Sequence, residues 1–168
     1  MTQTLSISRA VRIAAAVAMA ILLAACSRGP GGLDTSTASL TVGRAAPGSS
    51  QDFVVNVGDR VFFDTDSSDF TPVAIATLNK QITWLAQYPR YAFTIEGHAD
   101  ERGTREYNIA LGARRAAAVR EYFVSHGIAA ARMRTISYGK ERPVAVCDDN
   151  SCWAQNRRAV IVLNNAGV

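Results

Sequence analysis

The stretch Thr94 to Val119, TIEGHADERGTREYNIALGARRAAAV, links a predicted strand to a predicted helix through a charged loop. Alternation of side chains from Tyr91 to Glu96 is typical of a strand, and Gly97 marks its end. The helix is expected from Thr104 to Ser125, with Gly127 just beyond it as a C-terminal cap. Its apolar stripe comprises Tyr107, Leu111, Ala118, Tyr122 and Phe123. This strand and helix are the centre around which the other elements are placed.

Apolar periodicity predicts further elements on both sides of this centre. A helix begins at Thr71 as N-cap, has Pro72 in its first turn and ends near Tyr88 because Pro89 follows. Its apolar stripe comprises Ile75, Leu78, Ile82 and Leu85. Strands are expected at Arg60–Phe63, Arg134–Tyr138 and Ala159–Leu163, with a weaker one at Asp52–Val57. The order predicts an α+β fold, a two-layer sandwich with helices on one face of a mixed sheet.

The first 25 residues have the features of a bacterial secretory signal. Arg9 and Arg12 precede an apolar run, Ile13 to Ala25, which is shorter than the roughly 20 residues that cross a bilayer. The run ends in LAAC, which resembles the lipobox after which the signal is cut to leave a lipid-bearing cysteine, here Cys26 with N-palmitoyl and S-diacylglycerol groups. Ser27 next to it implies the outer membrane. Alternatively, Cys26 is a small buried thiol at the end of an ordinary signal or anchor helix.

The mature chain divides into a tether and one domain. Residues 26–51 hold the lipidated cysteine and a segment rich in Gly, Ser, Thr, Ala and Pro, which lacks the apolar residues needed to fold. Residues 52–168 then form the domain. Loss of the signal removes Arg9 and Arg12, so 16 basic residues face 14 acidic ones and the formal charge falls from +4 to +2. A nearly balanced, exported chain without a Lys/Arg run does not fit nucleic-acid binding.

Two cysteines of the domain, Cys147 and Cys152, lie five residues apart. The spacing does not match a Cys-x-x-Cys redox pair, and no nearby histidine or further cysteine would complete a metal site. In an oxidising periplasm we expect a structural disulfide that closes a small loop before the last strand.

The charged loop allows catalytic and metal-binding interpretations, but neither is well supported. Successive positions at the end of a strand point to different sides, and His98, Asp100 and Glu101 would have to supply all three ligands from one short loop. A carboxylate pair for glycosidic chemistry, Asp100 with Asp64 or Asp66, has no apolar surroundings that would raise the pKa of one acid. We therefore expect neither an enzyme nor a cofactor-binding protein.

A binding site for a dipolar ligand fits the helical spacing better. Asn108, Leu111 and Arg115 are three and then four residues apart, so they share one helix face. Asp100 lies just before the helix begins. This places a carboxylate and a guanidinium at two poles, which suits a zwitterionic amino-acid end. Alternatively, Asp100 and Arg115 pair with each other or with neighbours as a structural ion pair of small energetic value.

Three segments carry a family resemblance. EGHADERGTREYNIALGARRAAAVREYF, ISYGKERP and AQNRRAVIVL resemble the OmpA-like family of peptidoglycan-binding domains from Val61 to Leu163, and the lipobox directs the resemblance to the lipoproteins of the Tol–Pal system. It implies non-covalent binding to meso-diaminopimelate in the stem peptide, with Asp100 on the ammonium and Arg115 on the carboxylate. Further contacts are implied for Asp66, Arg102, Asn108 and Leu111. His98 would support the site without touching the ligand.

The same resemblance implies how the protein works in the envelope. An outer-membrane lipoprotein with its domain in the periplasm would tie the membrane to the wall and serve envelope integrity and cell division. TolB is implied as a partner that competes with the wall for an overlapping surface, and TolA as a second partner.

Overall fold

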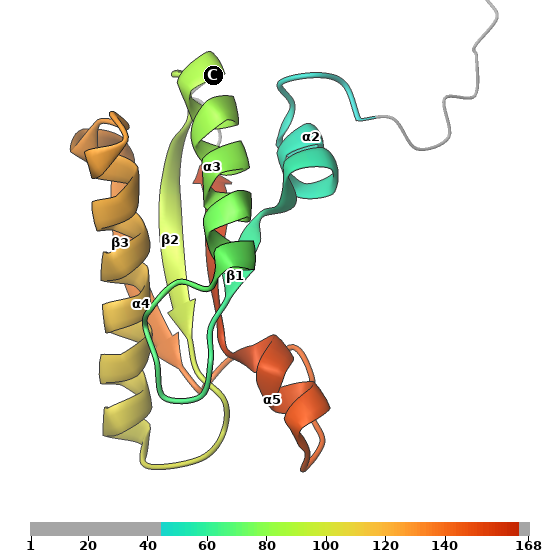
Figure 1. The fold of residues 1–168 in the computed structure, drawn as a ribbon, viewed down its shortest axis with the longest axis vertical. Helices are drawn as coiled ribbons and strands as arrows, with labels where there is room; N and C mark the ends of the chain where they lie inside the picture. Colours follow the sequence, from blue (N-terminus) through green and yellow to red (C-terminus); the bar gives the residue numbers. More distant parts are fainter. Residues whose placement is uncertain (1–44, 165–168) are drawn as a thin grey trace, which may run out of the picture. The chain divides into compact units, whose positions relative to one another are not determined.

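The computed structural model describes residues 45–164 of the chain. The predicted signal, Cys26 and most of the predicted tether lie outside the described residues. Within residues 45–164, no helix is long and apolar enough to cross a membrane. The elements run in the order α2 (Ser50–Asp52), η2 (Phe53–Gly58), β1 (Arg60–Phe62), α3 (Pro72–Gln87), β2 (Ala92–His98), α4 (Arg105–Ser125), η3 (Ala130–Arg132), β3 (Met133–Gly139), α5 (Asn150–Asn156) and β4 (Arg158–Asn164) (Figure 1).

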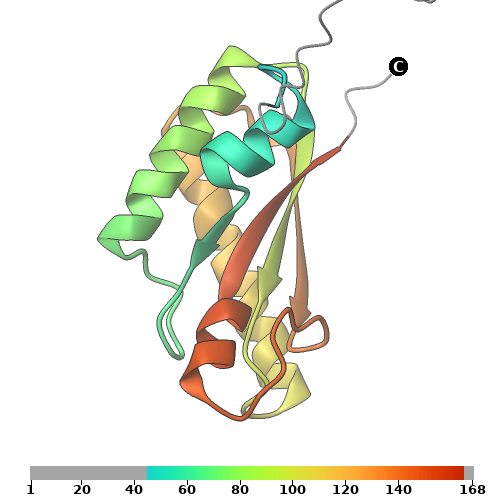
Figure 2. The same ribbon diagram turned by 90° about the vertical axis from the view of Figure 1, so that its right-hand side faces the viewer.

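One four-stranded mixed sheet forms the first layer, with strand order β1-β4-β2-β3. β2 and β3 are parallel and are joined through α4, whereas β4 runs antiparallel to both β1 and β2. A parallel pair needs such a crossover connection, and the helix supplies it. Figure 2 shows α3 and α4 together on one side of the sheet. The predicted α+β two-layer architecture is confirmed.

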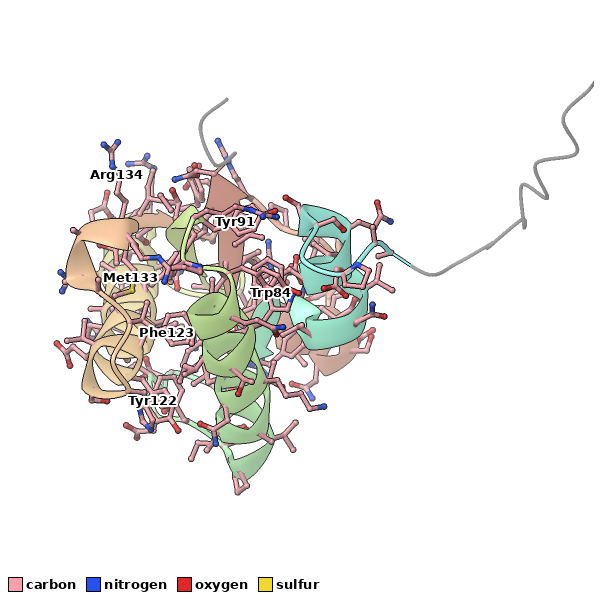
Figure 3. The ribbon with its side chains drawn as sticks, turned by 90° about the horizontal axis from the view of Figure 1, so that it is seen from above. Trp84, Tyr91, Tyr122, Phe123, Met133 and Arg134 are labelled. Atoms are coloured by element: carbon pink, nitrogen blue, oxygen red, sulfur yellow. A yellow bond between two sulfur atoms is a disulfide. The ribbon has the colours of Figure 1, made fainter. Side chains whose placement is uncertain are left out.

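The core lies between the sheet and these two helices. Phe93 and Ile95 of β2 and Ile161 of β4 are almost completely buried against α3 and α4. Figure 3, which looks along the layers from above, shows Phe123 of α4 between the helices and Trp84 beside α2. Each large apolar side chain buried in this way stabilises the fold by about 1.5–3 kcal/mol.

β2 extends further than the sequence predicted. Gly97 was expected to end the strand, but it belongs to β2 and pairs with Ala159 of β4. A Cβ at Gly97 would collide with the backbone carbonyl of Gly112 in α4. The glycine is therefore needed because the helix and the strand touch backbone to backbone at this point, just before the charged loop begins.

The weaker strand predicted at Asp52–Val57 is wrong, because this segment is helical. Ser49 caps it through a bond from the Asp52 amide, and the Asp52 carboxylate accepts bonds from the Gly48 amide and the Trp84 indole, both at 2.8 Å. Phe53 then packs on Trp84 at 4.9 Å between ring centroids. These contacts with residues distant in sequence outweigh an apolar alternation that would also fit a strand.

The N-terminal part of the described chain contacts the start of β2. The Gly48 carbonyl accepts hydrogen bonds from the Tyr91 hydroxyl and the Arg90 guanidinium, both at 2.8 Å. Contacts with the domain thus reach back to Gly48, into the segment that the sequence assigned to the tether. They fix the place at which the N-terminal segment enters the domain.

A short helix that was not predicted from the sequence, α5, lies between β3 and β4. Asp149 caps it by accepting a bond from the Ser151 amide at 2.7 Å. Cys147 and Cys152 form a disulfide that joins the preceding loop to this helix. Figure 2 shows α5 at the lower end of the sheet, where β4 begins.

Candidate ligand-binding site

A pocket of about 240 Å³ lies at the end of the sheet where β2 finishes and α4 starts. Figure 1 shows the β1–α3 loop and the β2–α4 loop at this same lower end. All six residues that the sequence analysis named as peptidoglycan contacts line it, together with three that it did not name. The full lining is Thr65, Asp66, Asp100, Arg102, Gly103, Tyr107, Asn108, Leu111 and Arg115.

The start of α4 fixes the geometry of the pocket. Thr104 caps the helix by accepting a bond from the Tyr107 amide at 3.2 Å. Asn108 donates to the carbonyls of Arg102 at 2.7 Å and Thr104 at 3.1 Å, and so holds the charged loop against the first helical turn. Leu111 follows on the same face of the helix and is buried. The shared face that the spacing predicted is therefore the face that lines the pocket.

Arg115 is completely buried and has no acidic partner among the residues that the structure describes. Its guanidinium donates to three backbone carbonyls, those of Ser67 at 2.8 Å, His98 at 2.8 Å and Asp64 at 3.0 Å. Burial lowers the pKa of Arg115 to about 10, so the group stays cationic near neutral pH. The charges of Asp100 and Asp66 stabilise this cation from a distance, but no carboxylate touches it, so the group favours direct contact with an incoming anion.

Asp100, the opposite pole, is compensated within the protein. Its carboxylate accepts the side chain of Arg102 at 2.6 Å and that of Arg157 at 3.3 Å. Burial alone would raise the pKa of Asp100, but hydrogen bonds from Arg102 and Arg157 outweigh it and hold the pKa below the usual range. The alternative of a structural ion pair thus holds for Asp100 with its neighbours and does not hold between Asp100 and Arg115.

The loop after β1 closes one side of the pocket. Asp66 has a left-handed backbone, with φ of 57°, and its carboxylate accepts a bond from the Tyr107 hydroxyl. Tyr107 was expected in the apolar stripe of the helix, but its side chain is 44% exposed and lines the pocket. The signal for this was its position one turn before Leu111 on the face that carries Asn108 and Arg115.

His98 does not line the pocket. Its ring lies 3.4 Å from Arg158 through Nδ1 and 3.6 Å from the Glu96 carboxylate through Nε2, and it packs on Tyr138. Burial and the neighbouring positive charges lower the pKa of His98 to about 4, with burial the larger cause. The ring is therefore neutral at neutral pH. It contributes to the site through its backbone carbonyl, which holds Arg115.

The residues considered for metal binding do not converge. The Glu101 carboxylate accepts a bond from the Trp153 indole, whereas the side chain of His98 contacts Arg158. Across residues 45–164, no three His, Cys, Asp or Glu side chains are arranged to hold a metal ion.

Two residues near α5 reach the site from far away in the sequence. Arg157, at the end of α5, contacts Asp100 and also donates to the Phe63 carbonyl at 3.1 Å. Trp153 lies with its ring 4.2 Å from the guanidinium of Arg102. Neither was named from the sequence, because nothing local links them to the charged loop.

The chain thus forms a small α+β domain with a pocket at one end of its sheet that is lined by both acidic and basic side chains. The OmpA family matches residues 62–158 of the chain, which include every residue of this pocket. The chain belongs to the OmpA family.

Similar proteins share one name. A protein of Rhizobium meliloti is 64% identical over 153 residues, which make up 90% of this chain and 87% of that protein, and one of Agrobacterium fabrum is 60% identical over 156 residues, 91% and 88% of the two chains. Each is called a peptidoglycan-associated lipoprotein.

Solved structures show the same fold. The crystal structure of the peptidoglycan-associated lipoprotein from Burkholderia pseudomallei is 43% identical, with a TM-score of 0.61 over 63% of this chain and 90% of that one. The C-terminal domain of Helicobacter pylori MotB shares the fold at 20% identity, with a TM-score of 0.60 over 64% of this chain and 84% of that one.

Proposed function

We propose that this chain is an outer-membrane lipoprotein whose periplasmic domain binds peptidoglycan without covalent attachment, through the meso-diaminopimelate of the stem peptide. The observation that carries the proposal is the pair of opposite poles in one pocket, an ionised Asp100 and a buried Arg115 that forms no ion pair with any residue from 45 to 164. Diaminopimelate in a stem peptide presents both an ammonium and a carboxylate. The names of the similar proteins support the same ligand class.

Each pole has a defined role in this proposal. Arg115 binds the carboxylate of the ligand, since a guanidinium can donate two parallel hydrogen bonds to it. Asp100 binds the ammonium, and Leu111 supplies an apolar wall for the methylene chain between the two groups. Asn108 keeps the loop in position, and Asp66 lies at the rim.

Access to Arg115 requires a small movement. Arg115 has no exposure in the empty pocket, and two of the carbonyls that hold it belong to Asp64 and Ser67 of the β1–α3 loop. We infer that this loop shifts when the ligand carboxylate replaces one of these carbonyls.

The expected affinity of one site is modest. Charged hydrogen bonds contribute about 1.5–3 kcal/mol each, and two or three of them, after the entropy of association, correspond to a dissociation constant of roughly µM to mM. Many lipid-anchored copies that face one polymer would hold it far more firmly through avidity. Weak, reversible binding by each copy, combined with many copies, suits a protein that connects the outer membrane to the peptidoglycan.

In the cell envelope we infer a place in the Tol–Pal system, with a role in envelope integrity and cell division. TolB is the partner expected to compete with peptidoglycan for an overlapping surface, and TolA a second partner. A test is whether purified TolB displaces the domain from sacculi. Binding to both at once would contradict an overlapping surface.

The main test is a pull-down with diaminopimelate-containing sacculi. We expect Asp100→Ala and Arg115→Ala to lower binding at least tenfold, because each removes one charged pole. Arg115→Lys tests the same pole with less disturbance of the carbonyls around it, and keeps the charge while losing the two-pronged donor. The Arg115 pole can also be tested with the protein unchanged. A muropeptide whose free diaminopimelate carboxylate is amidated should bind at least tenfold more weakly than the unmodified muropeptide.

Control variants remove similar charges outside the pocket. Asp69→Ala and Arg120→Ala should bind sacculi as the native chain does, and thermal unfolding identifies any variant that has lost its fold. Undiminished binding by folded Asp100→Ala and Arg115→Lys would refute the assignment of the site.

Two other outcomes would indicate a different function. Release of soluble fragments from purified peptidoglycan would indicate a wall-cleaving enzyme. Binding to TolB without binding to sacculi would indicate a lipoprotein that binds only other proteins.

A further inference from the structure

Arg102 forms a two-pronged ion pair with Asp100, the residue assigned to the ligand's ammonium. Its side chain contacts both oxygens of Asp100, with Nε 3.2 Å from Oδ1 and Nη2 2.6 Å from Oδ2. Its own backbone amide lies 3.2 Å from Oδ1. Arg157 adds a fourth bond, from Nη1 to Oδ2 at 3.3 Å.

These four bonds fill the acceptor capacity of Asp100. An ionised carboxylate has about four lone-pair positions, two on each oxygen, and each oxygen here accepts two donors. An ammonium cannot bond to this carboxylate until one donor leaves. If it entered beside both guanidiniums, three cations would also surround one negative charge.

The exposure of the donors shows which one can leave. The Arg157 side chain is 8% exposed and is also bonded to the Phe63 carbonyl, and the backbone amide of Arg102 is fixed in the loop. The Arg102 side chain is 41% exposed, whereas that of Asp100 is 10% exposed. Arg102 therefore covers Asp100 from the solvent side. Besides Asp100, its guanidinium bonds only weakly, to the Thr65 hydroxyl at 3.5 Å, so its side chain is the donor that can swing away.

We propose that the Arg102 side chain is an internal competitor of the ligand, which occupies the ammonium position in the empty pocket and must leave before the ligand binds. The proposal rests on the function proposed above. Trp153, stacked on the guanidinium at 4.2 Å, helps to hold this closed arrangement. The sequence resemblance implied that Arg102 contacts the ligand, and the proposed role is the opposite one.

The competitor keeps Asp100 paired while the pocket is empty and makes binding an exchange of one cation for another. The apparent affinity is the intrinsic affinity multiplied by the fraction of molecules in which Arg102 has left. A partly exposed two-pronged pair that is closed for most of the time lowers the affinity by about three- to tenfold.

The test measures binding of a soluble diaminopimelate muropeptide to the full chain by calorimetry. Arg102→Met keeps an extended side chain and every backbone bond of the loop but removes the guanidinium. We expect it to bind about three- to tenfold more tightly than the native chain. Its affinity should also fall more steeply with salt, because binding then creates an ion pair at Asp100 instead of exchanging one.

Arg105→Met is the matched control. Arg105 follows three positions later, its side chain is 65% exposed and pairs with Glu141, and it does not line the pocket. Arg105→Met removes the same charge as Arg102→Met, so its affinity for the muropeptide should stay within about twofold of the native value. A gain equal to that of Arg102→Met would show a general effect of charge and overturn the proposal.

Other outcomes separate this inference from the proposed function. Weaker binding by Arg102→Met would show that Arg102 contacts the ligand, and an unchanged affinity would show that it does not compete. Either result overturns the inference while native binding leaves the proposed function intact. A native chain that binds no diaminopimelate muropeptide would refute the proposed function and the inference with it.

Discussion

Asp100 and Arg115 carry opposite charges, and the protein compensates them in different ways. Asp100 is paired with two guanidiniums, whereas Arg115 donates its hydrogen bonds to backbone carbonyls and forms no ion pair within residues 45–164. Asp100 and Asp66 act on the Arg115 guanidinium only from a distance. We expect the carboxylate of a ligand to contribute more to affinity than the ammonium, because the carboxylate meets a buried cation that has no direct ion pair, whereas the ammonium must replace a cation already bound to Asp100.

The buried imidazole of His98 makes stability depend on pH. Its pKa of about 4 in the folded protein lies below the ordinary value of 6.5. Between these values the unfolded chain binds a proton that the folded chain does not, so stability falls as the pH is lowered from 6.5 to 4. The loss should reach up to about 3 kcal/mol. Urea unfolding at a series of pH values measures it.

A variant without the imidazole provides the control. His98→Gln fills a similar volume and does not titrate, so its free energy of unfolding should vary less with pH in this window. An equal slope for the native chain and His98→Gln would contradict the assignment of the effect to this residue. The lowered pKa of Asp100 acts in a more acidic range, since that carboxylate becomes protonated only below the usual aspartate value.

At the scale of elements, the contact between β2 and α4 places the two poles beside each other. Gly97 and Gly112 let the strand and the helix approach backbone to backbone, and the Ser137 hydroxyl of β3 adds a bond to the Ile109 carbonyl of α4 at 2.7 Å. α4 is thereby held along the end of β2, from which the Asp100 loop departs. A displacement of this helix would move Arg115 and Asn108 relative to Asp100.

Gly97→Ala tests this contact. An added methyl group would overlap the Gly112 carbonyl, and a backbone atom in a packed helix cannot yield easily. We expect the free energy of unfolding to fall by about 3 kcal/mol or more, measured by chemical denaturation. Gly127→Ala is the comparison, because its φ is +89° but no atom lies within 4 Å of the added carbon. The free energy of unfolding of Gly127→Ala should fall by only roughly 1–2 kcal/mol, the cost of placing a side chain on a left-handed backbone. An equal loss in both variants would argue against a close contact at Gly97.

At the scale of the whole domain, the pocket and the entry of the N-terminal segment lie at opposite ends of β2. Gly48 contacts Tyr91 just before the strand begins, and Asp100 follows just after it ends. Seven residues of strand span about 20 Å. The pocket and the place where the N-terminal segment enters the domain are thus separated by the length of β2.

The lipid should raise the affinity for a polymer but not the affinity for a single soluble ligand. We expect the lipidated chain in vesicles to bind sacculi at least a hundredfold more tightly than the same chain carrying Cys26→Ser, because many copies engage one polymer. Both forms should bind a soluble muropeptide equally. Sedimentation with sacculi and calorimetry with the muropeptide measure the two quantities. Equal binding to sacculi by both forms would contradict a role for avidity.

Local signals in the sequence were sufficient for the central elements. Thr71 is an N-cap in the structure, as predicted, and the second helix, predicted to start near Thr104, begins at Arg105 with Thr104 as its cap. The three- and four-residue spacing of Asn108, Leu111 and Arg115 placed these residues on one face, and that face lines the pocket. Caps and helical spacing involve neighbours within a few residues, so the sequence alone determines them.

Contacts between distant segments were decided only by the tertiary structure. The segment Asp52–Val57 alternates like a strand but is helical because Asp52 and Phe53 both meet Trp84 in α3. Arg157 reaches Asp100 across 57 positions of sequence. Which charges are compensated and which remain open to a ligand depends on such contacts. The sequence by itself therefore predicted the two poles, and the folded chain determined that Asp100 is already paired with Arg102 and Arg157, while Arg115 forms no ion pair within the described part of the chain.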